Sequence, residues 1–217
     1  MCEYEPATIQ LRADSSALSA TIANVRHWLM KRSQDPSLQY TVYPPKRVLN
    51  NLVGAKCELA MAKYLGEQNV HYISSAFLLT FGLFPPLFDF FLASGETLDV
   101  KGDRWDIRRL GGILENYKIE NERLNDYTVW AEARENSDSV ILHGYNTRGQ
   151  IREIHETRPD ATTPSGERMP KPCKRLTIED WHPLGELTRR LEPHRAENMR
   201  ATMVVQALMP NGEVREL

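Results

Sequence analysis

Cysteine is scarce in this chain, and its few cysteines form no recognisable pattern. The 217 residues contain three, Cys2, Cys57 and Cys173, which are odd in number, far apart, and without a C-x-x-C pair. This spacing argues against a disulfide framework and against a zinc knuckle. A reducing compartment, the cytoplasm, is the simplest location to expect.

The chain also lacks an excess of positive charge and any segment typical of export. Lys and Arg total 27 and Asp and Glu total 29, so the formal net charge is −2. A polyanionic partner would therefore have to meet a local basic patch. The first residues are acidic and are not followed by the apolar core of a signal peptide.

A long apolar stretch over residues 72–92 is too interrupted for a membrane helix. Pro85 and Pro86 break it, and Asp89 adds a charge within it. Such residues disfavour a helix in lipid and favour buried strands joined by a turn. We therefore expect no membrane partner.

Several common catalytic signatures are missing. The chain has no Walker loop, no G-x-S-x-G motif and no dinucleotide-binding fingerprint, which argues against the enzyme classes that depend on them. His143, His155 and His182 lack the spacing of metal ligands, and we interpret them as surface or core histidines.

The apolar pattern that is present predicts an α/β fold with a mixed central β-sheet flanked by helices. Helical spacing occurs over residues 15–33, and a second helix is expected from Lys46 or Asn50 to Leu65, with Gly66 as its C-cap. The predicted strands cover residues 77–84, 89–92, 97–101, 127–132, 140–145 and 203–208. A short amphipathic helix is expected over Leu184–Leu191.

The length suits a single domain, which we divide into four parts. Residues 1–45 are an N-terminal helix and loop, and residues 46–156 are the expected catalytic core. Residues 157–172 form a Pro-rich loop, and residues 173–217 form a C-terminal appendage.

The candidate chemistry begins with Asp99 and Lys101 in the run T-L-D-V-K-G. Residues two apart on a strand share one face, so these two side chains lie together while Leu98 and Val100 face a core. Placing charges on a mostly apolar strand has a free-energy cost and suggests a functional reason. The simpler alternative is an exposed salt bridge, which is common and contributes little to stability.

Asp89 joins this pair in only one register of the predicted hairpin. A three-residue loop over residues 93–95 pairs Asp89 with Asp99 and gives Gly95 the left-handed conformation that such loops favour. A two-residue loop would shift the register by one and turn Asp89 to the other face. The site hypothesis therefore depends on the three-residue loop.

Two carboxylates that meet repel each other unless a cation lies between them. Magnesium prefers such hard oxygen ligands, and the carbonyl oxygen of Val100 can add another; manganese is the expected substitute. The metal would lower the pKa of a bound water, and Lys101 would orient or activate that water and stabilise the transition state. This set suffices to hydrolyse a phosphodiester.

The motifs G-A-K-C-E-L-A-M-A-K-Y-L-G, D-F-F-L and L-D-V-K-G, within residues 46–102, resemble the PD-(D/E)XK, or restriction-endonuclease-like, nuclease superfamily. In style the chain is similar to its small stand-alone phage and bacterial members. In that family a helix supplies a glutamate, one strand opens with an aspartate, and the next carries D/E-x-K. The resemblance implies these roles, in order, for Glu58, Asp89, Asp99 and Lys101. The family's proline usually adjoins the first aspartate, whereas Pro85-Pro86 ends three residues before it here.

Two basic segments are candidate contacts with nucleic acid. The first follows the D-x-K motif and contains Arg104, Trp105, Arg108 and Arg109, which offer charges for phosphates and a ring for stacking on a base. The second follows the Pro-rich loop and contains Lys171, Lys174 and Arg175. Solvated surface loops are the alternative interpretation of both segments.

The sequence thus predicts a magnesium-dependent nuclease that hydrolyses DNA, while RNA stays open as a substrate. A homodimer would suit cutting both strands at once. Two alternatives remain: a catalytically inactive nuclease fold that binds nucleic acid, and a protein-interaction module, such as an adaptor or inhibitor, in which the carboxylates are structural.

Overall fold

A computed structural model of the chain describes residues 4, 6–11, 44–75, 88–103, 106–107, 111–115, 124–133, 137–154, 157–158, 173–191, 206–208 and 214–216. The predicted helix over residues 15–33, the predicted strand over residues 77–84 and most of the Pro-rich loop lie outside these ranges. Among the described helices, none combines the length and the apolar content needed to cross a membrane.

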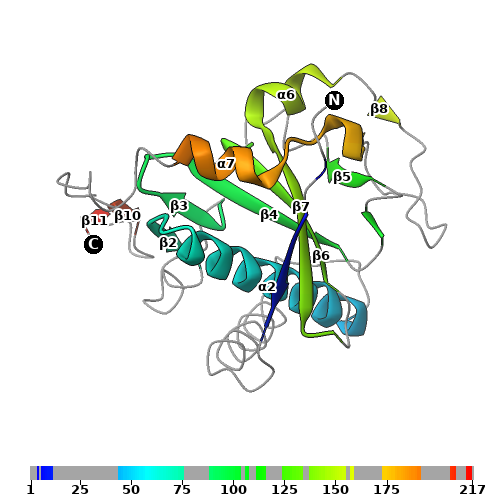
Figure 1. Ribbon diagram of the computed structural model, residues 1–217. Helices are drawn as coiled ribbons and strands as arrows, with labels where there is room; N and C mark the ends of the chain where they lie inside the picture. Colours follow the sequence, from blue (N-terminus) through cyan, green and yellow to red (C-terminus); the bar gives the residue numbers. More distant parts are fainter. Residues whose placement is uncertain are drawn as a thin grey trace.

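A six-stranded mixed sheet forms the centre of the molecule, with the order β1-β7-β6-β4-β3-β2. Its strands are β1 (Ala7–Gln10), β2 (Tyr72–Ser74), β3 (Phe90–Leu92), β4 (Thr97–Asp103), β6 (Tyr127–Ala133) and β7 (Ser139–Thr147). Strands β4 and β6 run parallel, and their other pairings in this sheet are antiparallel. Helix α2 (Pro44–Glu67) runs along the sheet (Figure 1). The expected mixed α/β architecture is confirmed.

Smaller elements surround this sheet. Strands β5 (Gly112–Glu115), β9 (Cys173–Leu176) and β8 (Thr157–Arg158) form a three-stranded sheet, and β10 (Gln206–Leu208) pairs with β11 (Val214–Glu216). The helices are α6 (Arg148–Glu153), the 3-10 turn η2 (Ile178–Asp180) and α7 (Leu184–Leu191). Helix α7 has the predicted bounds, and β10 lies within the predicted strand over residues 203–208.

The predicted helix is confirmed as α2, which extends beyond each predicted end. The helix begins at Pro44, because proline in the first turn loses no hydrogen bond and already has a helical φ. It continues through Gly66 to Glu67, and Asn69 rather than the glycine adopts the left-handed conformation, with φ of 57°. Asparagine tolerates this conformation better than most residues.

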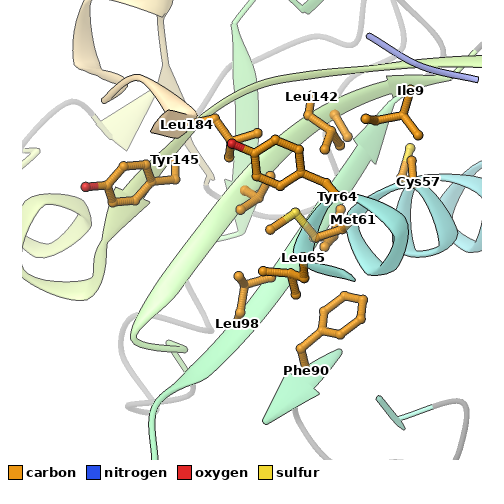
Figure 2. Close-up of a cluster of buried hydrophobic side chains, with 14 of the residues drawn as sticks. Ile9, Cys57, Met61, Tyr64, Leu65, Phe90, Leu98, Leu142, Tyr145 and Leu184 are labelled. Atoms are coloured by element: carbon orange, nitrogen blue, oxygen red, sulfur yellow. The ribbon is translucent and has the colours of Figure 1, made fainter. Parts of the chain in front are cut away.

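Helix α2 and the sheet bury the main hydrophobic cluster between them. Met61, Tyr64 and Leu65 project from the helix toward the strands, where Phe90 and Leu98 meet them (Figure 2). Helix α7 adds further members of the same cluster, Leu184, Leu187 and Leu191. Because side chains alternate along β4, burial of Leu98 and Val100 here turns Asp99 and Lys101 to the other face.

A second cluster lies on the opposite face of β6. Its centre is Trp130, whose ring stacks on Trp181 with centroids 6.0 Å apart and whose indole N–H donates to Asn146 Oδ1 at 2.7 Å. Other members are Ile107, Leu114, Leu124, Ile151 and Leu176. Residues 173–191 therefore contribute to both clusters.

Helix α2 approaches β4 closely at Gly102. A Cβ at this position would lie 2.7 Å from Cys57 Sγ. We expect Gly102→Ala to lower the free energy of unfolding by about 1–3 kcal/mol, because overpacking forces the two elements apart. Chemical denaturation measures this loss, and adding Cys57→Ala should restore most of it. Gly66→Ala is the control, since a Cβ there meets nothing within 4 Å; an equal loss in that variant would contradict the packing argument.

Candidate metal centre

The β3–β4 hairpin has the register that the site hypothesis requires. Phe90 pairs with Leu98 and Phe91 with Thr97, which corresponds to a three-residue loop. Gly95 in this loop has φ of 86°, a left-handed value that glycine adopts without strain. The prediction of loop length and register is confirmed.

Asp89 itself does not continue the ladder as a partner of Asp99. Its main-chain N–H donates to the carbonyl oxygen of Leu98 at 3.0 Å, and its carboxylate Oδ2 accepts from the N–H of Val100 at 2.6 Å. Strand β3 begins only at Phe90, so the Val100 N–H needs another acceptor. The Asp89 carboxylate fills that role at the edge of β4, and the predicted direct pairing with Asp99 is wrong.

This hydrogen bond also orients a main-chain oxygen. In an extended strand, the N–H and C=O of one residue point toward the same neighbouring strand. Since the Val100 N–H points to Asp89, the Val100 carbonyl faces the same edge of β4. The sheet edge thus gathers a carboxylate and a carbonyl oxygen, as expected from the sequence.

Asp99 and Lys101 form an ion pair through Asp99 Oδ2 and Lys101 Nζ. Their side chains are 13% and 25% exposed, respectively, so the pair is far less solvated than an ordinary surface salt bridge. Partial burial of charged groups carries a desolvation cost that an exposed surface pair does not carry. The exposed-salt-bridge interpretation therefore does not describe this pair.

Glu58 on α2 is the third carboxylate of the group. Burial, reinforced by the nearby Asp89 and Asp99 carboxylates, raises the pKa of Glu58 to about 8, and Lys101 only partly offsets this. The helix therefore brings Glu58 within electrostatic reach of the three strand residues. All four residues that the sequence singled out lie in one neighbourhood.

The donor chemistry of this group fits a hard divalent cation. It offers three carboxylates and a main-chain carbonyl for one ammonium group, and magnesium prefers oxygen ligands of this kind. In the conformation described, however, no three His, Cys, Asp or Glu side chains within the described ranges are arranged to hold a metal. Asp99 is paired with Lys101, so metal binding would require this contact to be exchanged.

The predicted nucleic-acid contacts are placed only in part. Arg104, Trp105, Arg108, Arg109 and Lys171 lie outside the described residues. Lys174 and Arg175 belong to β9, where they pair with Leu114 and Ile113 of β5. These two residues are therefore part of a small sheet rather than of a loop, and their role in binding stays a prediction.

Sequence reasoning missed a buried polar group on β6 and β7. His143 Nε2 lies 3.5 Å from Glu132 Oε2, and both side chains are almost completely buried. The Tyr4 hydroxyl forms a hydrogen bond with His143 Nδ1, and Trp181 packs against the imidazole with ring centroids 5.8 Å apart. A glutamate inside the apolar run V-W-A-E-A was the available signal. The position of His143 beside this glutamate depends on a register shift between β6 and β7 next to Trp130.

The raised pKa of Glu58 predicts how the metal-free protein responds to pH. Its folded-state pKa of about 8 lies above the ordinary value of 4.5, so the folded chain holds an extra proton between these values. Stability should therefore fall as pH rises from about 5 to 8, and Glu58→Gln should remove that part of the fall. Thermal melts in EDTA measure it. A pH dependence unchanged by Glu58→Gln would contradict the assignment.

Comparisons with protein-family models, with curated proteins and with solved structures found no match to this chain. The function proposed below therefore rests on the geometry and chemistry of the site.

Proposed function

We propose that this chain is a magnesium-dependent nuclease with a restriction-endonuclease-like core that hydrolyses phosphodiester bonds in DNA. The observation that carries the proposal is the partly buried Asp99–Lys101 pair on β4, with Asp89 on the adjoining strand edge and Glu58 on the covering helix. Phosphodiester hydrolysis by metal catalysis needs such carboxylates and benefits from a cation beside them.

Each residue has a distinct role in this proposal. Asp89 and Asp99 are metal ligands, the Val100 carbonyl adds a third, and Glu58 binds the ion directly or through a water. A bound magnesium ion would supply a water of lowered pKa and would stabilise charge on the phosphoryl oxygens. Lys101, once parted from Asp99, would donate a hydrogen bond to the attacking water or to a phosphoryl oxygen on which negative charge develops.

The hydrogen bond from Val100 to Asp89 supports this arrangement for a structural reason. It fixes the Asp89 carboxylate to the main chain of the strand that also carries Asp99 and Lys101. The separation of the two ligands is therefore set by backbone geometry rather than by a mobile loop. Catalytic groups held on rigid elements keep the accuracy that in-line attack needs.

The proposal is tested by incubating the protein with supercoiled plasmid and with single-stranded DNA, in magnesium, in manganese and in EDTA. We expect cleavage with either metal and none in EDTA. Asp138→Asn is the matched control, because this aspartate is exposed and lies outside the site. A folded wild-type protein that cuts neither DNA nor RNA would refute the proposal and favour the inactive binding or adaptor alternative.

A further inference from the structure

Two phenylalanine side chains form an aromatic surface beside the candidate metal centre. Along β3, Phe90 and Leu92 are 1% and 0% exposed and belong to the main core, whereas Phe91 between them points to the opposite face and stays partly exposed. Phe88, just before the strand, is also partly exposed. Its ring packs against Phe91 with centroids 5.8 Å apart and planes inclined by 43°. We refer to Phe88 and Phe91 as the aromatic pair.

The hairpin register places the aromatic pair close to the carboxylates. Phe91 is the cross-strand partner of Thr97, and Asp99 follows two residues later on the same face. Diagonal neighbours of this kind lie roughly 7–8 Å apart, within reach of an aromatic side chain. Asp89 stands between Phe88 and Phe91 in the chain. A phosphate held at the two aspartates would therefore have an aromatic ring within the span of one nucleotide.

We propose that the aromatic pair stacks on an unpaired nucleobase next to the scissile phosphate, so that the substrate is single-stranded at the site. This inference rests on the proposed nuclease function and names its substrate class. An aromatic ring stacks on the face of any base. A base within a duplex already has both faces covered by its neighbours, so it must leave the stack before it can reach such a ring.

The charge of the protein agrees with this mode of binding. Proteins that grip duplex DNA through its phosphates use many Lys and Arg side chains, but this chain has a formal net charge of −2. Stacking supplies affinity that does not depend on neutralising phosphates. Stacking therefore adds affinity for an unpaired strand that a duplex, whose bases are already stacked, does not receive.

The first test measures binding by fluorescence anisotropy, with labelled oligothymidine and with an abasic oligonucleotide of the same length. Lys101→Met serves as the background, so that in magnesium the strand is cut slowly, about a hundredfold or more below the wild-type rate, while binding is measured. We expect Phe91→Leu to weaken binding of oligothymidine about tenfold and to leave abasic binding unchanged, because only the base stacks. Phe91→Trp retains stacking and is the matched control. If Phe91→Leu folds poorly, the same binding measurement is made with Phe88→Leu.

The second test compares cleavage by the wild-type protein of a single strand and of the corresponding duplex. We expect the single strand to be cut about ten times faster, and Phe91→Leu to raise KM for it about tenfold while kcat changes less than twofold. Oligouridine in place of oligothymidine shows whether the stacked base comes from RNA as well as DNA; base-dependent binding of either strand supports the inference.

Three outcomes would overturn the inference. The first is equal weakening of abasic and oligothymidine binding by Phe91→Leu, and the second is duplex cut as fast as the single strand. The third is a dimer that dissociates in Phe91→Leu, since the aromatic pair would then contact a second copy. A wild-type protein that cuts no strand at all refutes only the proposed nuclease function, because the base-dependent binding is read out separately.

Discussion

Replacing Asp99 with asparagine is expected to lower metal-dependent cleavage by about a thousandfold or more, while the chain stays folded. In the proposed mechanism Asp99 supplies a ligand oxygen whose charge the amide would not replace, and a catalytic metal contributes several kcal/mol to stabilising the transition state. Initial rates of plasmid nicking in magnesium measure the effect. The asparagine also removes one of the two aspartates that raise the pKa of Glu58, so the metal-free protein should not be strongly destabilised.

Two comparisons give this result its meaning. Asp138→Asn changes an exposed carboxylate outside the site and should cut at the wild-type rate. A thermal melt of Asp99→Asn separates lost chemistry from lost structure. Cleavage that persists in Asp99→Asn would mean that a different site, or a contaminating nuclease, performs the reaction.

Lys101→Met should produce a different defect from that of Asp99→Asn. Methionine retains much of the lysine's apolar stem but cannot donate a hydrogen bond or stabilise negative charge. We expect turnover to fall by about a hundredfold to a thousandfold, a loss typical of removing one stabilising donor, with KM little changed. Removing the ammonium that now pairs with Asp99 should also leave metal binding intact or tighter.

The split between turnover and metal binding distinguishes a catalytic lysine from a structural one. Single-turnover cleavage at saturating magnesium isolates the chemical step, and Lys63→Met is the control, because Lys63 is an exposed lysine whose nearby carboxylate is Glu67. A Lys101→Met protein with weaker metal binding and unchanged turnover would show that Lys101 only shapes the site.

The hairpin could be predicted from the sequence because its determinants are local. Polar and apolar residues alternate from Thr97 to Lys101, and a glycine ends a loop of three residues, so strand, turn and register follow from neighbouring positions. The prediction that failed, the direct pairing of Asp89 with Asp99, depends on where β3 begins. One residue more in that strand would have changed the acceptor of the Val100 N–H.

Other features depend on contacts between distant segments. Strands β2, β5, β8 and β9 have two to four residues each, which is too short for a period of two to be recognised. A proline pair is usually interpreted as the end of a helix, but α2 begins at Pro44. Proline is favourable in the first turn of a helix, so the same residues can mark a start. The contact of His143 with Glu132 follows from a register shift that no local pattern indicates.

The most direct test of the account is a titration of the wild-type protein with manganese, monitored by the electron paramagnetic resonance of the free ion. We predict one bound ion per chain, competition by magnesium, and loss of binding in the double variant Asp89→Asn, Asp99→Asn, while Asp138→Asn binds normally. Retained binding in the double variant, or no binding by the folded wild-type protein, would contradict the assignment of this carboxylate group as a metal site.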